Sequence, residues 1–172
     1  MFAIVEEPLD VGALVQDVQS PDCGAIVTFV GTTRIDESDG AAVEYLEYEA
    51  YRPMADRKLE EIGVEIEGRW DVRHVSIVHR LGRVDPGEAS VAIVVAAPRR
   101  GPAFEASRYA IERIKEVVPI WKREVWSDGY VWVGSQVGTR DQVSGTGFQG
   151  LSGNCRSTTA DSLAGATLAA RR

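Results

Sequence analysis

The 172-residue sequence predicts an α+β fold in which a mixed or largely antiparallel sheet packs against two main helices. Three observations favour this class. Short β-branched apolar runs recur along the chain, two stretches carry apolar residues at helical spacing, and turn-rich segments separate them. The predicted order is strand, strand, helix, two strands, helix and hairpin. This order lacks the regular strand–helix alternation of a parallel α/β fold.

The first half of the chain contains two predicted strands and one helix. Residues 24–34, "GAIVTFVGTTR", predict a buried strand that ends in a Gly-Thr-Thr-Arg loop, and the polar residues 34–41 predict a loop. Residues 43–51, "VEYLEYEAY", predict the second strand. Pro53 predicts a helix start, because proline at the first helical position loses no hydrogen bond. The apolar face of this helix comprises Ala55, Leu59, Ile62, Ile66 and Trp70.

The second half contains two more strands, a helix and a hairpin. Residues 75–82 predict a strand and "VDPGE" at 84–88 a turn, whereas 89–97, apolar on both faces, is typical of a central strand. Gly101 and Pro102 mark a helix start, and Pro119 ends that helix. "IWKREVW" and "YVWV", on either side of "SDG", predict a C-terminal hairpin. The expected inward face of the second helix comprises Phe104, Ser107, Ile111, Ile114 and Val118.

The composition changes near residue 138. The last 35 residues are rich in Gly, Ser, Thr and Ala and poor in large apolar side chains, so they offer little surface to bury. We expect residues 1–137 to form one folded domain and residues 138–172 to form a flexible, low-complexity tail.

Charge and composition exclude several functions. The net charge of −7 argues against non-specific binding to nucleic acid or to an anionic membrane, because both are polyanions. The acidic N-terminus lacks the features of a signal peptide, and no apolar run is long enough to span a bilayer. Cys23 and Cys155 have no metal or disulfide spacing, and His74 and His79 lack ligand partners nearby in sequence. We therefore expect a cytoplasmic protein without a metal or a resident cofactor.

Two lysines have mostly apolar neighbours in "IKEVVPIWKRE", residues 114–124. Lys115 falls beside Ile111 at the edge of the apolar face of its helix, so we expect it to be half-buried. Lys122 follows the break at Pro119 on an extended segment. The two amines can then approach one spot from a helix end and a strand.

Three arginines lie at the ends of predicted elements, two before a helix and one after a strand. Arg99 and Arg100 precede a helix N-terminus, where backbone N–H groups favour an anion. Arg34 ends the first strand, after Thr32 and Thr33, whose hydroxyl groups can donate hydrogen bonds. Together with the lysines, these residues predict a pocket for a phosphorylated ligand.

A plainer interpretation fits each of these residues taken alone. A lysine at a helix edge often packs its stem and keeps its amine in water. Arg34 could pair with an acidic residue of the following loop, and Arg99 and Arg100 could form a solvated pair. The charges at 122–124 could alternate along an edge strand. Local physics alone predicts an α+β domain with a candidate anion site.

Five stretches, in order, resemble the family of large, catalytic subunits of molybdopterin synthase, the MoaE family. The Lys-x6-Lys-Arg-Glu pattern after an apolar helix is the most specific of them. The stretches span residues 24–133 and read "GAIVTFVGTTR", "LEYEAY", "VSIVHRLGRVDPGE", "PRRGPAFEASRYAIERIKEVVPIWKRE" and "GYVWV".

The resemblance implies a reaction and a set of partners. Members of the family convert cyclic pyranopterin monophosphate into molybdopterin by installing a dithiolene. The sulfur comes from a thiocarboxylate at the C-terminal Gly-Gly of a small ubiquitin-like subunit, whose tail inserts into the large subunit. The family assembles as a large-subunit dimer with one small subunit at each end. Its fold is described as an α/β-hammerhead with an additional β subdomain.

The resemblance also implies site residues. The family's two catalytic lysines fall on Lys115 and Lys122, and its substrate loop falls on Thr32, Thr33 and Arg34. Arg99 stands where many members have histidine, and Thr32 stands where many have lysine. The remaining matched positions are Arg100, Arg123 and Glu124. The family also implies that the arginine pair reaches into the pocket of a neighbouring subunit.

Lys115 is the leading candidate for proton transfer, and Lys122 for charge stabilisation and thiocarboxylate positioning, although the sequence permits the reverse assignment. The competing interpretation is a non-catalytic docking module for a ubiquitin-like tail. Such a tail needs a narrow channel and one or two cations. The additional arginines at 34, 99 and 100 favour the enzyme.

Overall fold

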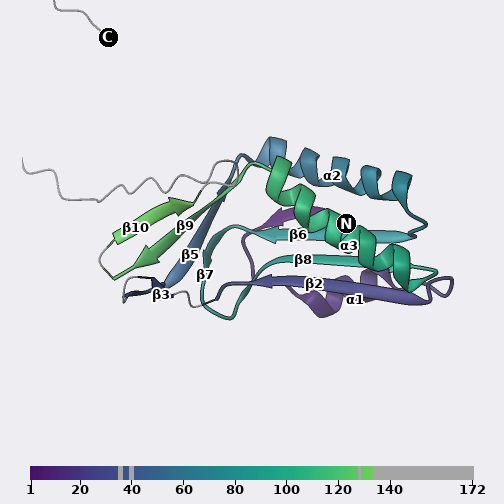
Figure 1. Ribbon diagram of the computed structural model, residues 1–172, viewed down its shortest axis with the longest axis horizontal. Helices are drawn as coiled ribbons and strands as arrows, with labels where there is room; N and C mark the ends of the chain where they lie inside the picture. Colours follow the sequence, from purple (N-terminus) through teal and green to yellow (C-terminus); the bar gives the residue numbers. More distant parts are fainter. Residues whose placement is uncertain (35–36, 39–40, 128, 134–172) are drawn as a thin grey trace, which may run out of the picture.

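The computed structural model describes residues 1–34, 37–38, 41–127 and 129–133, and its central element is a four-stranded sheet (Figure 1). The strand order is β1-β6-β8-β2, with β1 parallel to β6 and the other pairs antiparallel. This confirms the predicted α+β fold with a mixed sheet. The predicted tail, 138–172, lies outside the described residues. The strands are β1 (Phe2–Val5), β2 (Ala25–Thr32), β6 (His74–Arg80) and β8 (Ala89–Ala97).

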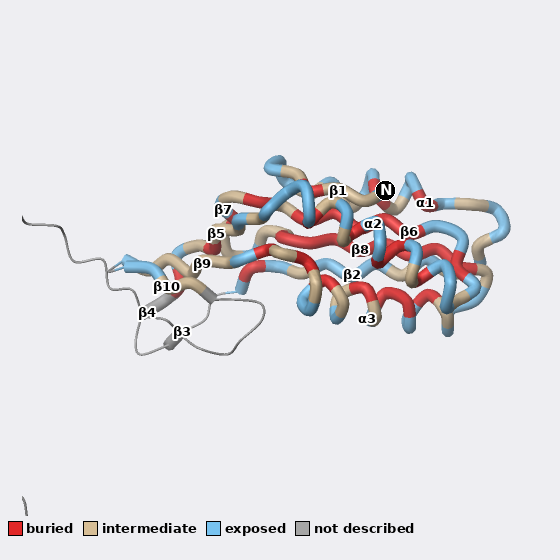
Figure 2. The backbone as a smooth tube through the Cα atoms, turned by 90° about the horizontal axis from the view of Figure 1, so that it is seen from above, coloured by how far each residue is buried: buried red, intermediate tan, exposed pale blue. Residues whose placement is uncertain are grey.

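Three helices cover this sheet. The two long helices, α2 (Arg52–Arg69) and α3 (Arg100–Val117), lie on one face, and the short α1 (Val11–Val18) lies on the other (Figure 1). The apolar face predicted for α2 is fully buried from Ala55 to Ile66. Strand β8 is buried along both faces, as expected for a central strand (Figure 2). None of the described helices combines the length and apolar character needed to cross a bilayer.

A second, antiparallel sheet continues from one end of the first (Figure 1). The predicted hairpin forms its edge, and the strand order is β10-β9-β5-β7. Gly82, with φ +73°, lies where the chain passes from β6 into β7 and thus from one sheet to the other. The strands are β5 (Tyr45–Ala50), β7 (Gly82–Val84), β9 (Ile120–Trp126) and β10 (Gly129–Val133).

The N-terminal part of the fold differs from the prediction. Sequence patterns did not indicate β1 and α1, because β1 has only four residues and α1 only eight, too few for a clear period. The first predicted strand, β2, is an edge strand and is not buried as expected: Ile26, Phe29 and Val30 are each 36% exposed. The predicted loop at 34–41 contains a short ladder of β3 (Glu37–Ser38) and β4 (Ala41–Ala42).

The inward face of α3 differs from the predicted one at Phe104. Ser107, Ile114 and Val118 are buried as predicted, but Phe104 is 62% exposed. Alanines at 103, 106 and 110 are fully buried instead. Small residues let the N-terminal half of α3 lie close to the sheet, which leaves no room for the phenyl ring on that face.

Candidate active site

A cavity of about 530 Å³ lies where the C-terminal half of α3 meets the junction of the two sheets. Its walls come from the ends of β2, β6 and β8, from α3, and from the facing strands β5 and β9. The volume is within the range typical of small-molecule sites, about 300–1,000 Å³. The lining is largely apolar and aromatic, and includes Phe29, Leu46, Tyr48, Val91, Ile111, Ile114, Val118 and Ile120.

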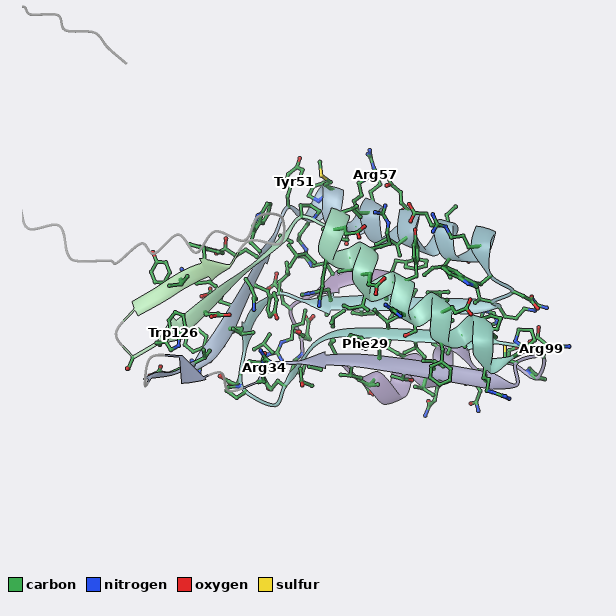
Figure 3. The ribbon with its side chains drawn as sticks, in the orientation of Figure 1. Phe29, Arg34, Tyr51, Arg57, Arg99 and Trp126 are labelled. Carbon is green, nitrogen blue, oxygen red and sulfur yellow. The ribbon has the colours of Figure 1, made fainter. Side chains whose placement is uncertain are left out.

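Three cationic side chains from different elements line this cavity. Arg34 follows the end of β2 (Figure 3), Lys115 is in the last turn of α3, and Lys122 is in β9. The chain has three lysines, and two of them are here although its net charge is −7. Such a concentration of positive charge on apolar walls suits an anionic ligand. The predicted meeting of the two lysines at one site is therefore found in the structure.

The two lysines have different surroundings. Lys115 shares the cavity-facing side of α3 with Ile111, but it is exposed and not half-buried as predicted. It follows the buried Ile114 and therefore points about 100° around the helix from that residue. No described residue forms an ion pair or hydrogen bond with its amine. Lys122 Nζ, by contrast, donates to Glu124 Oε1 at 3.1 Å, and the Glu124 side chain is only 15% exposed. The two amines are thus not equivalent.

Strand geometry separates the residues of the Lys-Arg-Glu motif. Side chains alternate along β9, so Lys122 and Glu124 face the cavity and Arg123 faces the other way. Arg123 binds Glu47 and lies over the rings of Tyr130 and Trp132. The hydrogen bond that Arg123 donates to the Glu47 carboxylate raises the pKa of Arg123. The geometry therefore gives Arg123 a place in the sheet outside the cavity.

The two threonines of the predicted substrate loop also differ in whether they line the cavity. Thr32 lines the cavity. Thr33 is only 2% exposed and does not line it. Its backbone N–H donates to Glu88 O at 3.0 Å, and its carbonyl accepts from Gly87 N–H at 2.7 Å. Thr33 thus fixes the backbone that leads to Arg34.

Arg99 and Arg100 lie at the opposite end of β2 and β8 from Arg34, as Figure 3 shows for Arg99. They line a separate hollow with Gly24, Pro98, Gly101 and Pro102. The eight residues of β2 span roughly 25 Å from this hollow to the end of the strand that leads to Arg34. Both arginines are exposed. Within one chain, the structure does not bring them together with Arg34, Lys115 and Lys122.

His79 at the end of β6 lines the cavity and was not among the predicted site residues. It is 6% exposed and packs edge-on against Tyr48, with ring centroids 5.1 Å apart. Nδ1 lies 2.8 Å from Arg80 O, so Nδ1 carries the proton and the distal Nε2 can only accept. Burial lowers the His79 pKa to about 4, so the ring is neutral at pH 7. Alternation along β6 places His79 on the same face as Val75 and Ile77, and this was the available sequence signal.

The neutral His79 predicts a pH-dependent stability. The unfolded chain titrates near the ordinary pKa of 6.5 and the folded chain near 4, so the unfolded state binds more protons between these values. Stability therefore falls as the pH falls through this window. We expect the free energy of unfolding of the wild type to fall by about 3 kcal/mol more than that of His79→Gln between pH 7 and pH 4.

Urea unfolding of both proteins at a series of pH values measures this difference. Other groups, such as Glu65, whose pKa is lowered by hydrogen bonds from Arg113 and Tyr109, titrate in both proteins and cancel in the comparison. Parallel curves for the two proteins would show that His79 does not resist protonation.

The sequence is similar to a known protein family and to curated relatives. Residues 4–117 match the family model described as MoaE protein. The chain is 49% identical over 144 residues to the molybdopterin synthase catalytic subunit of Halalkalibacterium halodurans, covering 84% of this chain and 92% of that one.

Solved structures give the same result. The crystal structure of molybdopterin synthase from Staphylococcus aureus has a TM-score of 0.74 and 46% identity, covering 77% of this chain and 96% of that one. A complex of subunits 1 and 2 of the molybdopterin-converting factor from Helicobacter pylori has a TM-score of 0.62 and 25% identity, covering 74% and 86%. With sequence and fold in agreement, this chain belongs to the MoaE family.

Proposed function

We propose that this chain is the sulfurtransferase subunit that converts cyclic pyranopterin monophosphate into molybdopterin. The main support for this proposal is that Arg34, Lys115 and Lys122 line one largely apolar cavity. The chain has only three lysines, and two of them are at this cavity. Apolar and aromatic walls suit a flat pterin ring, and the cations suit its phosphate and an incoming thiocarboxylate. The family membership supports the same chemistry.

Each sulfur transfer proceeds in two steps. The thiocarboxylate sulfur attacks a side-chain carbon of the pterin, a carbon–sulfur bond forms, and a carbon–oxygen bond breaks as the oxygen leaves. Water then attacks the acyl carbon, the acyl–sulfur bond breaks, and the products are a carboxylate on the small subunit and a thiolate on the pterin. A dithiolene has two sulfurs, so both steps occur twice and consume two thiocarboxylates.

The contacts of the two lysines support different roles. Lys122 donates a hydrogen bond to Glu124, which fixes the position of its amine, so it stabilises negative charge on the thiocarboxylate and the leaving oxygen. Lys115 lines the cavity and forms no ion pair or hydrogen bond with a described residue, so its amine can reach the reacting atoms. It gives a proton to the leaving oxygen and takes one from the attacking water. Arg34 binds the phosphate.

We further propose that a second copy of the chain completes the site. Arg99 and Arg100 are too far from the cavity to act in their own chain, yet both are exposed beside a helix N-terminus that favours anions. The edge strand β2, with Ile26, Phe29 and Val30 each 36% exposed, offers an apolar border for the second copy. In a two-fold dimer, the arginine pair of each chain would serve the cavity of the other.

The sulfur donor in this proposal is a small ubiquitin-like carrier subunit with a C-terminal Gly-Gly thiocarboxylate. The relative from Helicobacter pylori was solved as a complex of two subunits, which supports the pairing of a large with a small chain. With the dimer of large chains proposed above, this pairing gives a heterotetramer. We place the reaction in the cytoplasm, because two widely separated cysteines suit a reducing compartment. Residues 1–137 are the proposed catalytic domain.

Reconstitution tests the function against the docking alternative. The purified chain is mixed with thiocarboxylated small subunit and cyclic pterin, and dithiolene is detected as its oxidised fluorescent derivative. The enzyme hypothesis predicts product that increases with time. A complex that binds the small subunit tightly and yields no product would support a non-catalytic docking module.

Deleting residues 142–172 is expected to leave sulfur transfer within about twofold of the full chain and thermal stability nearly unchanged. The reason is the Gly/Ser/Thr/Ala composition of this segment, which provides few apolar side chains to bury against the domain. Activity assays and thermal melts of both lengths check this. A large fall in either quantity would assign the segment a place on the domain or on the partner.

A further inference from the structure

The backbone that presents Arg34 to the cavity is held by a turn at residues 85–88. Thr33, the preceding residue, binds this turn through both of its backbone groups: its N–H donates to Glu88 O at 3.0 Å and its carbonyl accepts from Gly87 N–H at 2.7 Å. Gly87 has φ +88°, a conformation that other residues rarely adopt. The position of Arg34 therefore depends on the position of this turn.

The turn is itself held by one carboxylate. Glu88 Oε2 accepts from Asp85 backbone N–H at 3.0 Å, which closes the turn, and from Arg80 Nη1 at 3.1 Å. Arg80 also donates through Nη2 to Arg83 O at 3.0 Å, so its guanidinium joins both sides of the β7–β8 connection. The Arg80 side chain is only 12% exposed, which restricts its movement.

We propose that Arg80 and Glu88 are positioning residues for substrate binding by Arg34. Neither side chain lines the cavity, so neither touches the substrate. Their ion pair fixes the turn, the turn fixes both backbone groups of Thr33, and Thr33 sets the direction in which Arg34 leaves the strand. A guanidinium binds a phosphate through fixed, planar donors, so a small change in its direction costs affinity. This inference rests on the proposed function, in which Arg34 binds the phosphate of the cyclic pterin.

The test compares Glu88→Ala with Glu65→Ala. Glu65 is a matched control: it accepts hydrogen bonds from Arg113 and Tyr109, its side chain is 32% exposed, and it lies between α2 and α3 away from the cavity. Both variants should lose thermal stability. Only Glu88→Ala should raise the KM for cyclic pterin, by about tenfold, with kcat within about threefold of the wild type. Glu88→Gln, which retains an accepting oxygen, should lie between Glu88→Ala and the wild type.

A double-mutant cycle with Arg34→Ala separates positioning from general loosening of the fold. If Glu88 acts through Arg34, Glu88→Ala should raise KM by less than about twofold in the Arg34→Ala background. If the two effects on KM multiply, or if Glu65→Ala raises KM as much as Glu88→Ala does, the positioning role is overturned. An active wild type with an unchanged KM in Glu88→Ala would overturn this inference alone. An inactive wild type would overturn the proposed function and this inference with it.

Discussion

Lys115→Ala is expected to lower the rate of dithiolene formation by about 10³-fold, while binding of the small subunit and folding are retained. Lys115 lines the cavity from the last turn of α3, and a positioned proton-transfer group contributes about 10²–10⁴-fold to a rate. The side chain is exposed and has no partner among the described residues, so its removal should change stability by less than about 0.5 kcal/mol. Single-turnover assays and thermal melts measure the two effects.

Lys115→Arg distinguishes proton transfer from charge stabilisation. Arginine keeps the positive charge but does not release its proton near neutral pH, so this variant should also fail. Lys58→Ala is the matched control, because Lys58 is the third lysine of the chain and pairs with Glu61 on α2, outside the cavity. Near-normal turnover by Lys115→Arg would rule out proton transfer by this residue and favour the reverse assignment, with Lys122 as the proton-transfer group.

Mixed dimers of Lys115→Ala and Arg100→Ala chains are expected to recover about half of the wild-type activity, although each variant alone is nearly inactive. The reason is geometric: if Arg100 serves the cavity of the other chain, a mixed dimer contains one site with both defects and one site with neither. Arg100 lies in a hollow at the far end of β2 from the cavity, which is the arrangement that requires a second copy. Co-refolded, doubly tagged dimers verified by mass provide the material.

The control mixes Lys115→Ala with Lys122→Ala chains. Both lysines line the cavity of their own chain, so every site in that mixed dimer carries one defect and no activity should return. If dimers of the first mixture form and stay as inactive as their parents, the arginine pair does not act across the interface.

The fold could be predicted where the sequence pattern was long and regular. The apolar face of α2, the central strand β8 and the hairpin of β9 and β10 were all evident from spacing, because burial on one or both faces dictates residue type over many positions. β1 was not evident, since its place depends on parallel pairing with β6, more than 70 residues away in sequence. Long-range pairing leaves no local signal in a four-residue strand.

The sequence predicted correctly that Lys115 and Lys122 approach each other, but it did not predict where Arg99 and Arg100 lie. The local sequence pattern predicted that Lys115 and Lys122 lie close together, because a helix end and the strand that follows it are close in space as well as in sequence. The distance of Arg99 and Arg100 from the cavity follows from strand register, which composition does not encode. His79 was missed although alternation along β6 places it on the buried face, because its packing against Tyr48 joins two different sheets. Side chains alternate along a strand, so the assignment of residues 120–126 to a strand was enough to predict that Arg123 points away from the cavity.

The mass balance of one turnover tests sulfur transfer at this cavity directly. Wild-type chain, thiocarboxylated small subunit and cyclic pterin are mixed, and intact mass spectrometry follows the conversion of thiocarboxylate to carboxylate while the dithiolene is quantified. We expect the wild type to consume two thiocarboxylates for each dithiolene formed. With Lys115→Ala, we expect neither consumption of thiocarboxylate nor formation of dithiolene. Full retention of the thiocarboxylate in a stable wild-type complex, or undiminished consumption with Lys115→Ala, would contradict sulfur transfer at this cavity.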